Sequence, residues 1–203
     1  MRLAANKILL LLFLLIFLLP NSNMQSFGVT SQEEASKLSK GEVVASTLAS
    51  SGNDSSTIGV ESKIFINTPP QKLWNLISHQ EKLPEIIPSC KKAEILEKTD
   101  NSEKVEYLVK ISPFLPVFKY VLNVDQTEKY KKIKYNKIDG SFNKLYGSFE
   151  FEPYNNGTIL TYKMYIDPGF FVPSFICENG LRNALPDMLK KLKAKAESTP
   201  ESD

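Results

Sequence analysis

The sequence predicts an α+β fold in which a curved antiparallel sheet wraps around a long C-terminal helix. Three patterns in the 203 residues lead to this prediction. Apolar and polar side chains alternate with period two in several segments bounded by turn residues, which is typical of half-buried strands. Two short helical segments follow the first of these strands, and one long helical pattern lies after Pro173. Because the apolar face of the sheet has to be covered, we expect that last helix to cover it.

The first residues have the pattern of a secretory signal peptide. A short basic start, residues 1–7, precedes an unbroken apolar run from Ile8 to Leu19. A membrane-spanning helix needs about 20 apolar residues, so this run is short for a permanent anchor. We therefore expect residues 1–23 to direct export to the periplasm or out of the cell. An uncleaved signal that anchors the chain in the membrane is the alternative.

A polar segment separates this signal from the folded domain. Residues 24–56 are rich in Ser, Gln, Glu and Lys, and such a segment cannot offset the entropy lost on ordering by burying apolar surface. We expect a polar linker here, with a possible short strand at residues 42–47. The domain is then expected to occupy residues 57–198, followed by a tail at residues 199–203.

Alternation becomes clear at residues 58–66, the first predicted strand of the domain. Residues 68–71 have the pattern of a capping box, with Thr68 as the N-cap of a helix that extends to about residue 78. A second short helix is expected at residues 80–88. Further strands are predicted at residues 93–97, 105–112, 120–127, 132–138, 148–152 and 158–166. The final helix places lysines near its C-terminal end, where the helix dipole favours positive charge.

Composition excludes several classes of function. The formal net charge is +2, and Arg2 and Lys7 in the signal account for this excess. Binding to nucleic acid needs a clustered excess of Lys and Arg, so we expect no nucleic-acid partner. Two Cys and one His are too few for a disulfide framework or a Cys/His metal cluster, and we expect no cofactor.

Four stretches of the sequence carry a family resemblance: residues 70–74, 81–92, 107–120 and 140–153. In this order and spacing they resemble the coenzyme Q-binding START-like and polyketide cyclase/dehydrase branch of the SRPBCC superfamily, over roughly residues 56–197. The resemblance implies a helix-grip, START-like fold with a hydrophobic cavity between the sheet and the C-terminal helix. Members use this cavity for lipids, quinones, polyketides or hormones, so the fold alone does not define the function.

Strand parity and loop composition define the side chains expected at this cavity. Hairpin topology brings the loops at residues 113–118, 139–145 and 167–174 to one end of the sheet, which we call the portal end. Two of these loops are strongly apolar, which predicts a lined portal or a surface that touches lipid. Tyrosine hydroxyls are the expected polar anchors, and solid core packing is the alternative. The expected ligand-binding residues are Tyr107, Val109, Ile111, Phe114, Phe118, Tyr120, Leu122, Phe149, Phe151, Tyr162, Met164, Phe170, Phe171, Phe175, Leu181 and Leu185.

Cysteine and histidine are the other residue types that could carry chemistry. The same hairpin topology places Cys90 and Cys177 at the portal end of the sheet. A disulfide between them could form there in an oxidising compartment. His79 is the only histidine. No Ser or Cys with the sequence context of a nucleophile accompanies it, so we expect a surface or capping role.

The leading interpretation is an exported, non-catalytic binding or carrier protein for a hydrophobic small molecule, such as a lipid or an isoprenoid quinone. A polyketide cyclase/dehydrase-like enzyme is the first alternative, although the sequence shows no acid and base at convincing spacing. A module whose apolar loops dock onto a membrane surface or another protein is the second alternative.

Overall fold

The computed structural model describes residues 32–49, 56–111, 116–169 and 174–198, and for residues 174–183 it describes the backbone alone. The predicted signal peptide and the tail lie outside these ranges. Within them, none of the helices combines the length and the apolar character that crossing a bilayer requires.

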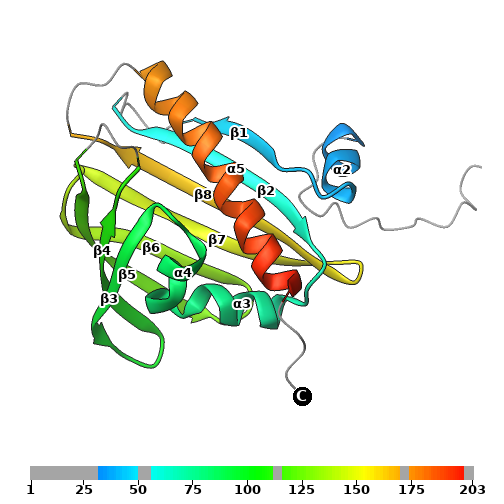
Figure 1. Cartoon of the computed structure of the whole chain (residues 1–203), viewed down its shortest axis with the longest axis horizontal. Coiled ribbons are helices and arrows are strands. Elements are labelled where there is room, and N and C mark those ends of the chain that lie inside the picture. Colours follow the sequence, from blue (N-terminus) through cyan, green and yellow to red (C-terminus); the bar gives the residue numbers. More distant parts are fainter. Residues whose placement is uncertain (1–31, 50–55, 112–115, 170–173, 199–203) are drawn as a thin grey trace, which may run out of the picture. The chain divides into compact units, whose positions relative to one another are not determined.

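One antiparallel sheet forms the framework of the described part of the chain (Figure 1). Its strand order is β1-β2-β8-β7-β6-β5-β4-β3, so each strand from β3 to β8 pairs with the next one along the chain. The predicted strands are confirmed; most are longer than predicted, but β4 ends before the predicted limit of residue 112. The strands are β1 (Val44–Leu48), β2 (Ile58–Ile66), β3 (Cys90–Lys98), β4 (Ser102–Val109), β5 (Phe118–Glu128), β6 (Lys132–Gly140), β7 (Lys144–Tyr154) and β8 (Gly157–Asp167).

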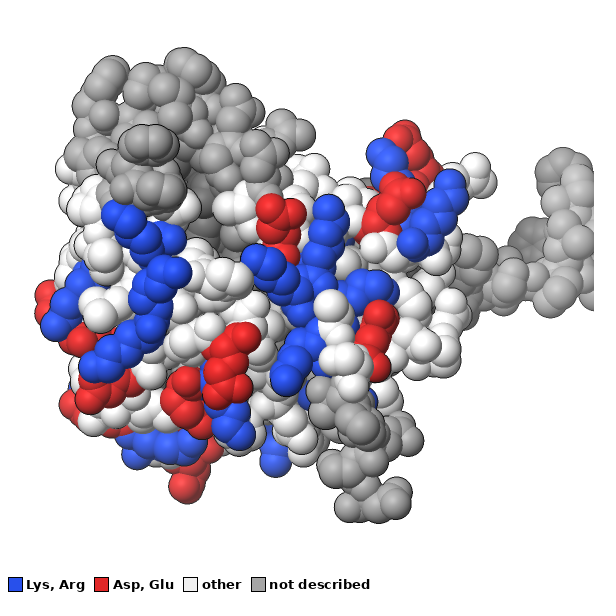
Figure 2. Space-filling model, in the orientation of Figure 1, with Lys and Arg blue, Asp and Glu red and all other residues white. Residues whose placement is uncertain are grey.

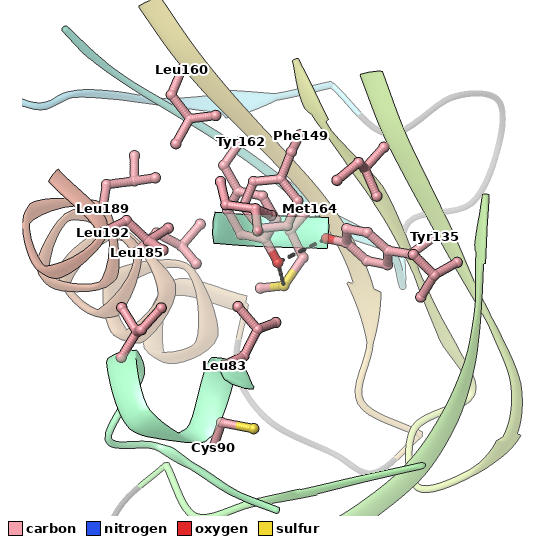
Figure 3. Close-up of a cluster of buried hydrophobic side chains, with 14 of the residues drawn as sticks. Leu83, Cys90, Tyr135, Phe149, Leu160, Tyr162, Met164, Leu185, Leu189 and Leu192 are labelled. Atoms are coloured by element: carbon pink, nitrogen blue, oxygen red, sulfur yellow. Dashed lines mark hydrogen bonds between the residues drawn. The ribbon is translucent and has the colours of Figure 1, made fainter. Parts of the chain in front are cut away.

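The long helix α5 (Ser174–Ser198) lies across one face of the sheet, as expected (Figure 1). It contacts β1 and β2, and it also touches the short helices α3 (Pro70–Ser78) and α4 (Leu83–Ile86). Leu185, Leu189 and Leu192 on this helix are buried, and they point toward β8, which carries Leu160 and Tyr162 (Figure 3). The predicted α+β architecture, a sheet gripping its C-terminal helix, is therefore confirmed.

Charged side chains of both signs are spread over the face that carries α5 (Figure 2). Positive side chains gather over the C-terminal half of this helix, which contains Lys190, Lys191, Lys193 and Lys195. Their position suits the negative end of the helix dipole, as the sequence indicated.

The start of α3 differs from the prediction. The cap position is Pro69 and no side chain caps the helix, so the assignment of Thr68 as N-cap is wrong. Thr68 is instead buried against β8, where its carbonyl accepts a hydrogen bond from the Thr158 hydroxyl at 2.7 Å. Pro69 and Pro70 have no N–H groups, so this helix start has fewer donors that need a cap.

The segment predicted as a polar linker contains two ordered elements. Helix α2 (Gln32–Ser39) precedes β1, and β1 pairs with β2 from Val44 opposite Lys63 to Leu48 opposite Gly59. The short strand was expected, but the helix was not. Its single fully buried side chain, Leu38, and an ion pair between Glu34 and Lys63 at 3.0 Å hold it against the sheet. Such a short helix depends on tertiary contacts rather than on its own pattern, which is why the sequence did not reveal it.

Candidate ligand cavity

A cavity of about 150 Å³ lies on the concave side of the sheet, under the short helices and α5. Strands β3 to β8 supply most of its wall, Gln80 comes from the turn before α4, Leu83 from α4 itself and Met188 from α5. The described wall is mainly apolar and aromatic, which is the usual character of a site for a small organic molecule.

Seven of the sequence-predicted residues lie around this cavity. They come from β4, β5, β7 and β8, whose alternating side chains face the helices. The seven are Tyr107, Val109, Tyr120, Leu122, Phe149, Tyr162 and Met164.

Other predicted residues lie elsewhere. Ile111 is 50% exposed, because β4 ends at Val109 and the strand parity does not continue to residue 111. Phe118 is buried against Phe142, with ring centroids 4.9 Å apart, and does not reach the cavity. Phe151 packs on Trp74, with ring centroids 5.3 Å apart.

Leu185 is buried in the core and does not line the cavity either. Phe114, Phe170 and Phe171 lie outside the described residues, as do the side chains of Phe175 and Leu181.

Gln80 and Tyr135 are two of the polar residues at the cavity that sequence reasoning missed. Glutamine is usually found at the surface, yet Gln80 is only 4% exposed. Its amide Nε2 donates to the carbonyl of Ile77 at 2.8 Å, and its Oε1 accepts a hydrogen bond from the Tyr107 hydroxyl at 2.5 Å. Tyr135 is the other one, and its alternation with Ile133 in β6 was the signal that could have identified it.

Tyr135 reaches the cavity because Gly147 leaves space for it. Gly147 on β7 lies between Tyr135 of β6 and Met164 of β8. The Tyr135 hydroxyl lies 2.9 Å from the Tyr162 hydroxyl and 3.1 Å from the carbonyl of Lys163. The Tyr162 hydroxyl in turn lies 3.6 Å from the sulfur of Met164 (Figure 3). These contacts hold two tyrosine hydroxyls within a mainly apolar wall.

Burial changes the acidity of the groups at this wall. It raises the pKa of Tyr107 and Tyr135 well above the ordinary value, and it raises the pKa of Tyr162 to about 12. Burial also raises the pKa of the Cys90 thiol to about 11. At neutral pH the tyrosines therefore keep their protons and can donate hydrogen bonds, while the thiol is a weak nucleophile.

The remaining candidates for chemistry lie away from the cavity or are not tested. His79 is exposed, and its Nδ1 lies 2.7 Å from the carbonyl of Asn75. Glu150, which follows Phe149 on β7 and therefore lies on the opposite face of the sheet, forms ion pairs with Lys132 at 2.8 Å and Lys163 at 3.0 Å. Cys90 is buried at the cavity wall, whereas the side chain of Cys177 lies outside the described residues, so the disulfide stays a prediction.

Strand ends gather at the portal end, as hairpin topology predicts. The amide of Ser141 donates to the carbonyl of Lys119 at 2.7 Å, and the amide of Asn143 donates to the carbonyl of Asp167 at 2.9 Å. Phe142, between them, has a left-handed backbone with φ of 74° and contacts the ring of Tyr120. This contact places the loop between β6 and β7 beside the cavity wall.

A curved antiparallel sheet that closes on a C-terminal helix around an apolar cavity defines a START-like, helix-grip protein. Residues 66–193 match the family model described as polyketide cyclase/dehydrase and lipid transport, and the chain belongs to this family. No curated protein sequence matches the chain.

Several solved structures share the fold. A STAR-related lipid transfer protein fragment from Xanthomonas axonopodis superposes with a TM-score of 0.67 at 13% identity, covering 77% of this chain and 94% of that one. A START superfamily protein from Mycobacterium smegmatis gives 0.62 at 17% identity, covering 68% and 97%. The ZhuI aromatase/cyclase from a Streptomyces species gives 0.60 at 17% identity, covering 70% and 94%. At these identities the likeness defines the fold alone.

Proposed function

We propose that the protein is an exported, non-catalytic carrier or binding protein for a hydrophobic small molecule, such as a lipid or an isoprenoid quinone. The observation that carries this proposal is the cavity between the concave sheet face and the helices, with its apolar wall and buried tyrosine hydroxyls. The family description, which includes lipid transport, supports it. Export rests on the apolar run from Ile8 to Leu19.

The size of the cavity limits which part of such a molecule it holds. A dry cavity of about 150 Å³ has room for one benzene-sized ring, whereas sites for whole drug-sized ligands occupy about 300–1,000 Å³. We therefore propose that one end of the ligand enters the cavity and the remainder leaves toward the portal end. Each apolar Å² removed from water then stabilises the complex by about 25 cal/mol.

Binding is favoured over turnover by the chemistry of the wall. Proton transfer needs a group whose pKa lies near the working pH. Burial keeps the Tyr107, Tyr135 and Tyr162 hydroxyls protonated, and the Cys90 thiol as well. Among the described lining residues no carboxylate or imidazole accompanies them. Cyclase-like chemistry would therefore lack a base within this part of the wall.

The proposal is tested by filling the cavity. Val109 lines it, and a Val109→Phe variant places a phenyl ring inside its small volume. Native mass spectrometry of the wild-type protein, purified without detergent, is expected to show a bound hydrophobic molecule that the variant has lost. The variant should still fold, because the added ring occupies existing space.

Val121→Phe provides the matched control, because the cross-strand partner of Val121 is Glu106, on the opposite face of β4 from Tyr107. This variant should keep the bound molecule. A wild-type protein that carries nothing, and takes up nothing from a total lipid extract, would rule out the carrier proposal.

Apolar residues near the portal favour membrane docking as a second candidate function. Ile111 and Val117 flank the loop between β4 and β5 and are 50% and 52% exposed. Large apolar side chains exposed beside a cavity are typical of surfaces that touch lipid or protein. We expect the wild-type protein to float with phosphatidylcholine/phosphatidylglycerol vesicles, and Ile111→Ser with Val117→Ser to reduce the floating fraction several-fold. Leu96→Ser, a change at an exposed leucine near the far end of β3, is the control. Equal flotation of all three proteins would contradict docking through this loop.

A further inference from the structure

Tyr120 occupies a special place in the cavity wall. It lies on β5 with its ring stacked on Tyr107, at 5.6 Å between centroids and 29° between planes. Phe142 packs against the same ring, also at 5.6 Å between centroids. These two contacts hold the Tyr120 ring in position at the cavity.

The hydroxyl of Tyr120 differs from the other tyrosine hydroxyls at this wall. Tyr107 donates to Gln80, and Tyr135 and Tyr162 contact each other. The Tyr120 hydroxyl has no hydrogen-bond partner among the described residues, although the residue lines the cavity. Tyr120 is half-buried, so a ligand that enters the cavity would displace water from this hydroxyl and leave it unpaired, unless a ligand atom accepts its hydrogen bond.

The composition of the wall also disfavours charged ligands. The described lining residues include no Lys, Arg, His, Asp or Glu. An ionised carboxylate or phosphate placed in such a cavity would lose its hydration without gaining a counterion. A neutral oxygen loses much less, and a hydrogen bond from tyrosine compensates for the loss.

We propose that the Tyr120 hydroxyl donates a hydrogen bond to a neutral acceptor oxygen, a carbonyl or hydroxyl, on a ring-sized head group of the ligand, and that the cavity rejects anionic head groups. This inference rests on the proposed binding function and names the class of ligand. Tyr107, held by Gln80, keeps the Tyr120 ring aligned.

Three probes of similar shape test the inference: acetophenone, which has a neutral carbonyl, isopropylbenzene, which has no acceptor, and benzoate, which is an anion. Their affinities are measured by NMR chemical-shift titration of the full folded chain. Tyr120→Phe removes the hydroxyl and retains the ring. Tyr146→Phe, a change in a ring that stacks on Tyr165 away from the cavity, is the matched control.

We expect Tyr120→Phe to weaken acetophenone binding by about 2- to 10-fold, the range that one neutral hydrogen bond supplies, and to leave isopropylbenzene unchanged. Benzoate should bind at least about 10-fold more weakly than acetophenone, because no described lining residue offsets its charge. Tyr146→Phe should match the wild type.

Two results would overturn the inference while leaving the cavity a binding site: unchanged acetophenone affinity in Tyr120→Phe, or benzoate that binds as tightly as acetophenone. If none of the three probes shifts resonances of cavity residues, the proposed binding function itself fails, and the inference fails with it.

Discussion

Replacing Gly147 with alanine is expected to lower the free energy of unfolding by about 3 kcal/mol. A Cβ at this position would lie 2.0 Å from the carbonyl oxygen of Lys163 and 2.5 Å from the Tyr135 hydroxyl. The carbonyl belongs to the backbone of β8 and cannot rotate away as a side chain could. Forcing an extra group into a packed site costs about 1–3 kcal/mol and occasionally more. Urea unfolding followed by circular dichroism measures the change.

Gly41→Ala is the matched control for this prediction. There the nearest atom to the new Cβ is Nζ of Lys193 at 3.4 Å, at the end of a flexible side chain. The backbone at Gly41 has φ of 72°, so alanine should cost about 1 kcal/mol through conformation alone. A loss at Gly147 no larger than the loss at Gly41 would show that β7 and β8 separate easily, and the explanation of the Tyr135 position would be wrong.

The free energy of unfolding is expected to fall steeply between pH 10 and 12. An unfolded tyrosine loses its proton near its ordinary pKa of 10.0, whereas burial raises the pKa of Tyr162 in the folded protein to about 12. A raised pKa stabilises the folded state fully below pH 10, and this contribution is lost as the pH rises through about 12. At about 1.4 kcal/mol for each pKa unit, Tyr162 alone accounts for roughly 2 to 3 kcal/mol. Burial of Tyr107 and Tyr135 acts with the same sign.

Urea unfolding at several pH values in this window measures the effect. In Tyr162→Phe the fall in the free energy of unfolding between pH 10 and 12 should be smaller by about 2 kcal/mol, because phenylalanine has no proton to release. The comparison separates this tyrosine from lysine ion pairs, which also weaken at high pH. An identical alkaline slope in the two proteins would show that the Tyr162 hydroxyl is accessible to water in the folded state.

Most elements of the fold follow from local patterns. Alternation in residues 58–66 and 158–166 predicted two strands that turn out to be neighbours, and the repeat of apolar residues predicted the long helix. The order of hairpins then implied the portal end, where Lys119 and Ser141 do meet. These predictions succeed because the periodicity of a strand or helix and the formation of a turn are determined by residues close together in the sequence.

The cavity was predictable only in part. The alternation of side chains along the strands correctly predicted that Tyr107, Tyr120 and Tyr162 line the cavity, because these residues lie within regular strands. It failed for Ile111, since the strand ends two residues earlier. Phe151 faces the correct side of the sheet but packs on Trp74 of α3, a contact between segments distant in sequence.

Sequence patterns thus specify which segments become strands and helices, and which face of each is apolar, because these properties depend on neighbouring residues. The partners of individual polar atoms depend on the packing of distant segments. Gln80 is buried because Tyr107 comes to lie beside it, and Tyr135 crosses β7 because Gly147 has no side chain. The Tyr120 hydroxyl lacks a partner among the described residues for the same reason, since the shape of the closed sheet and helices determines what lies opposite it.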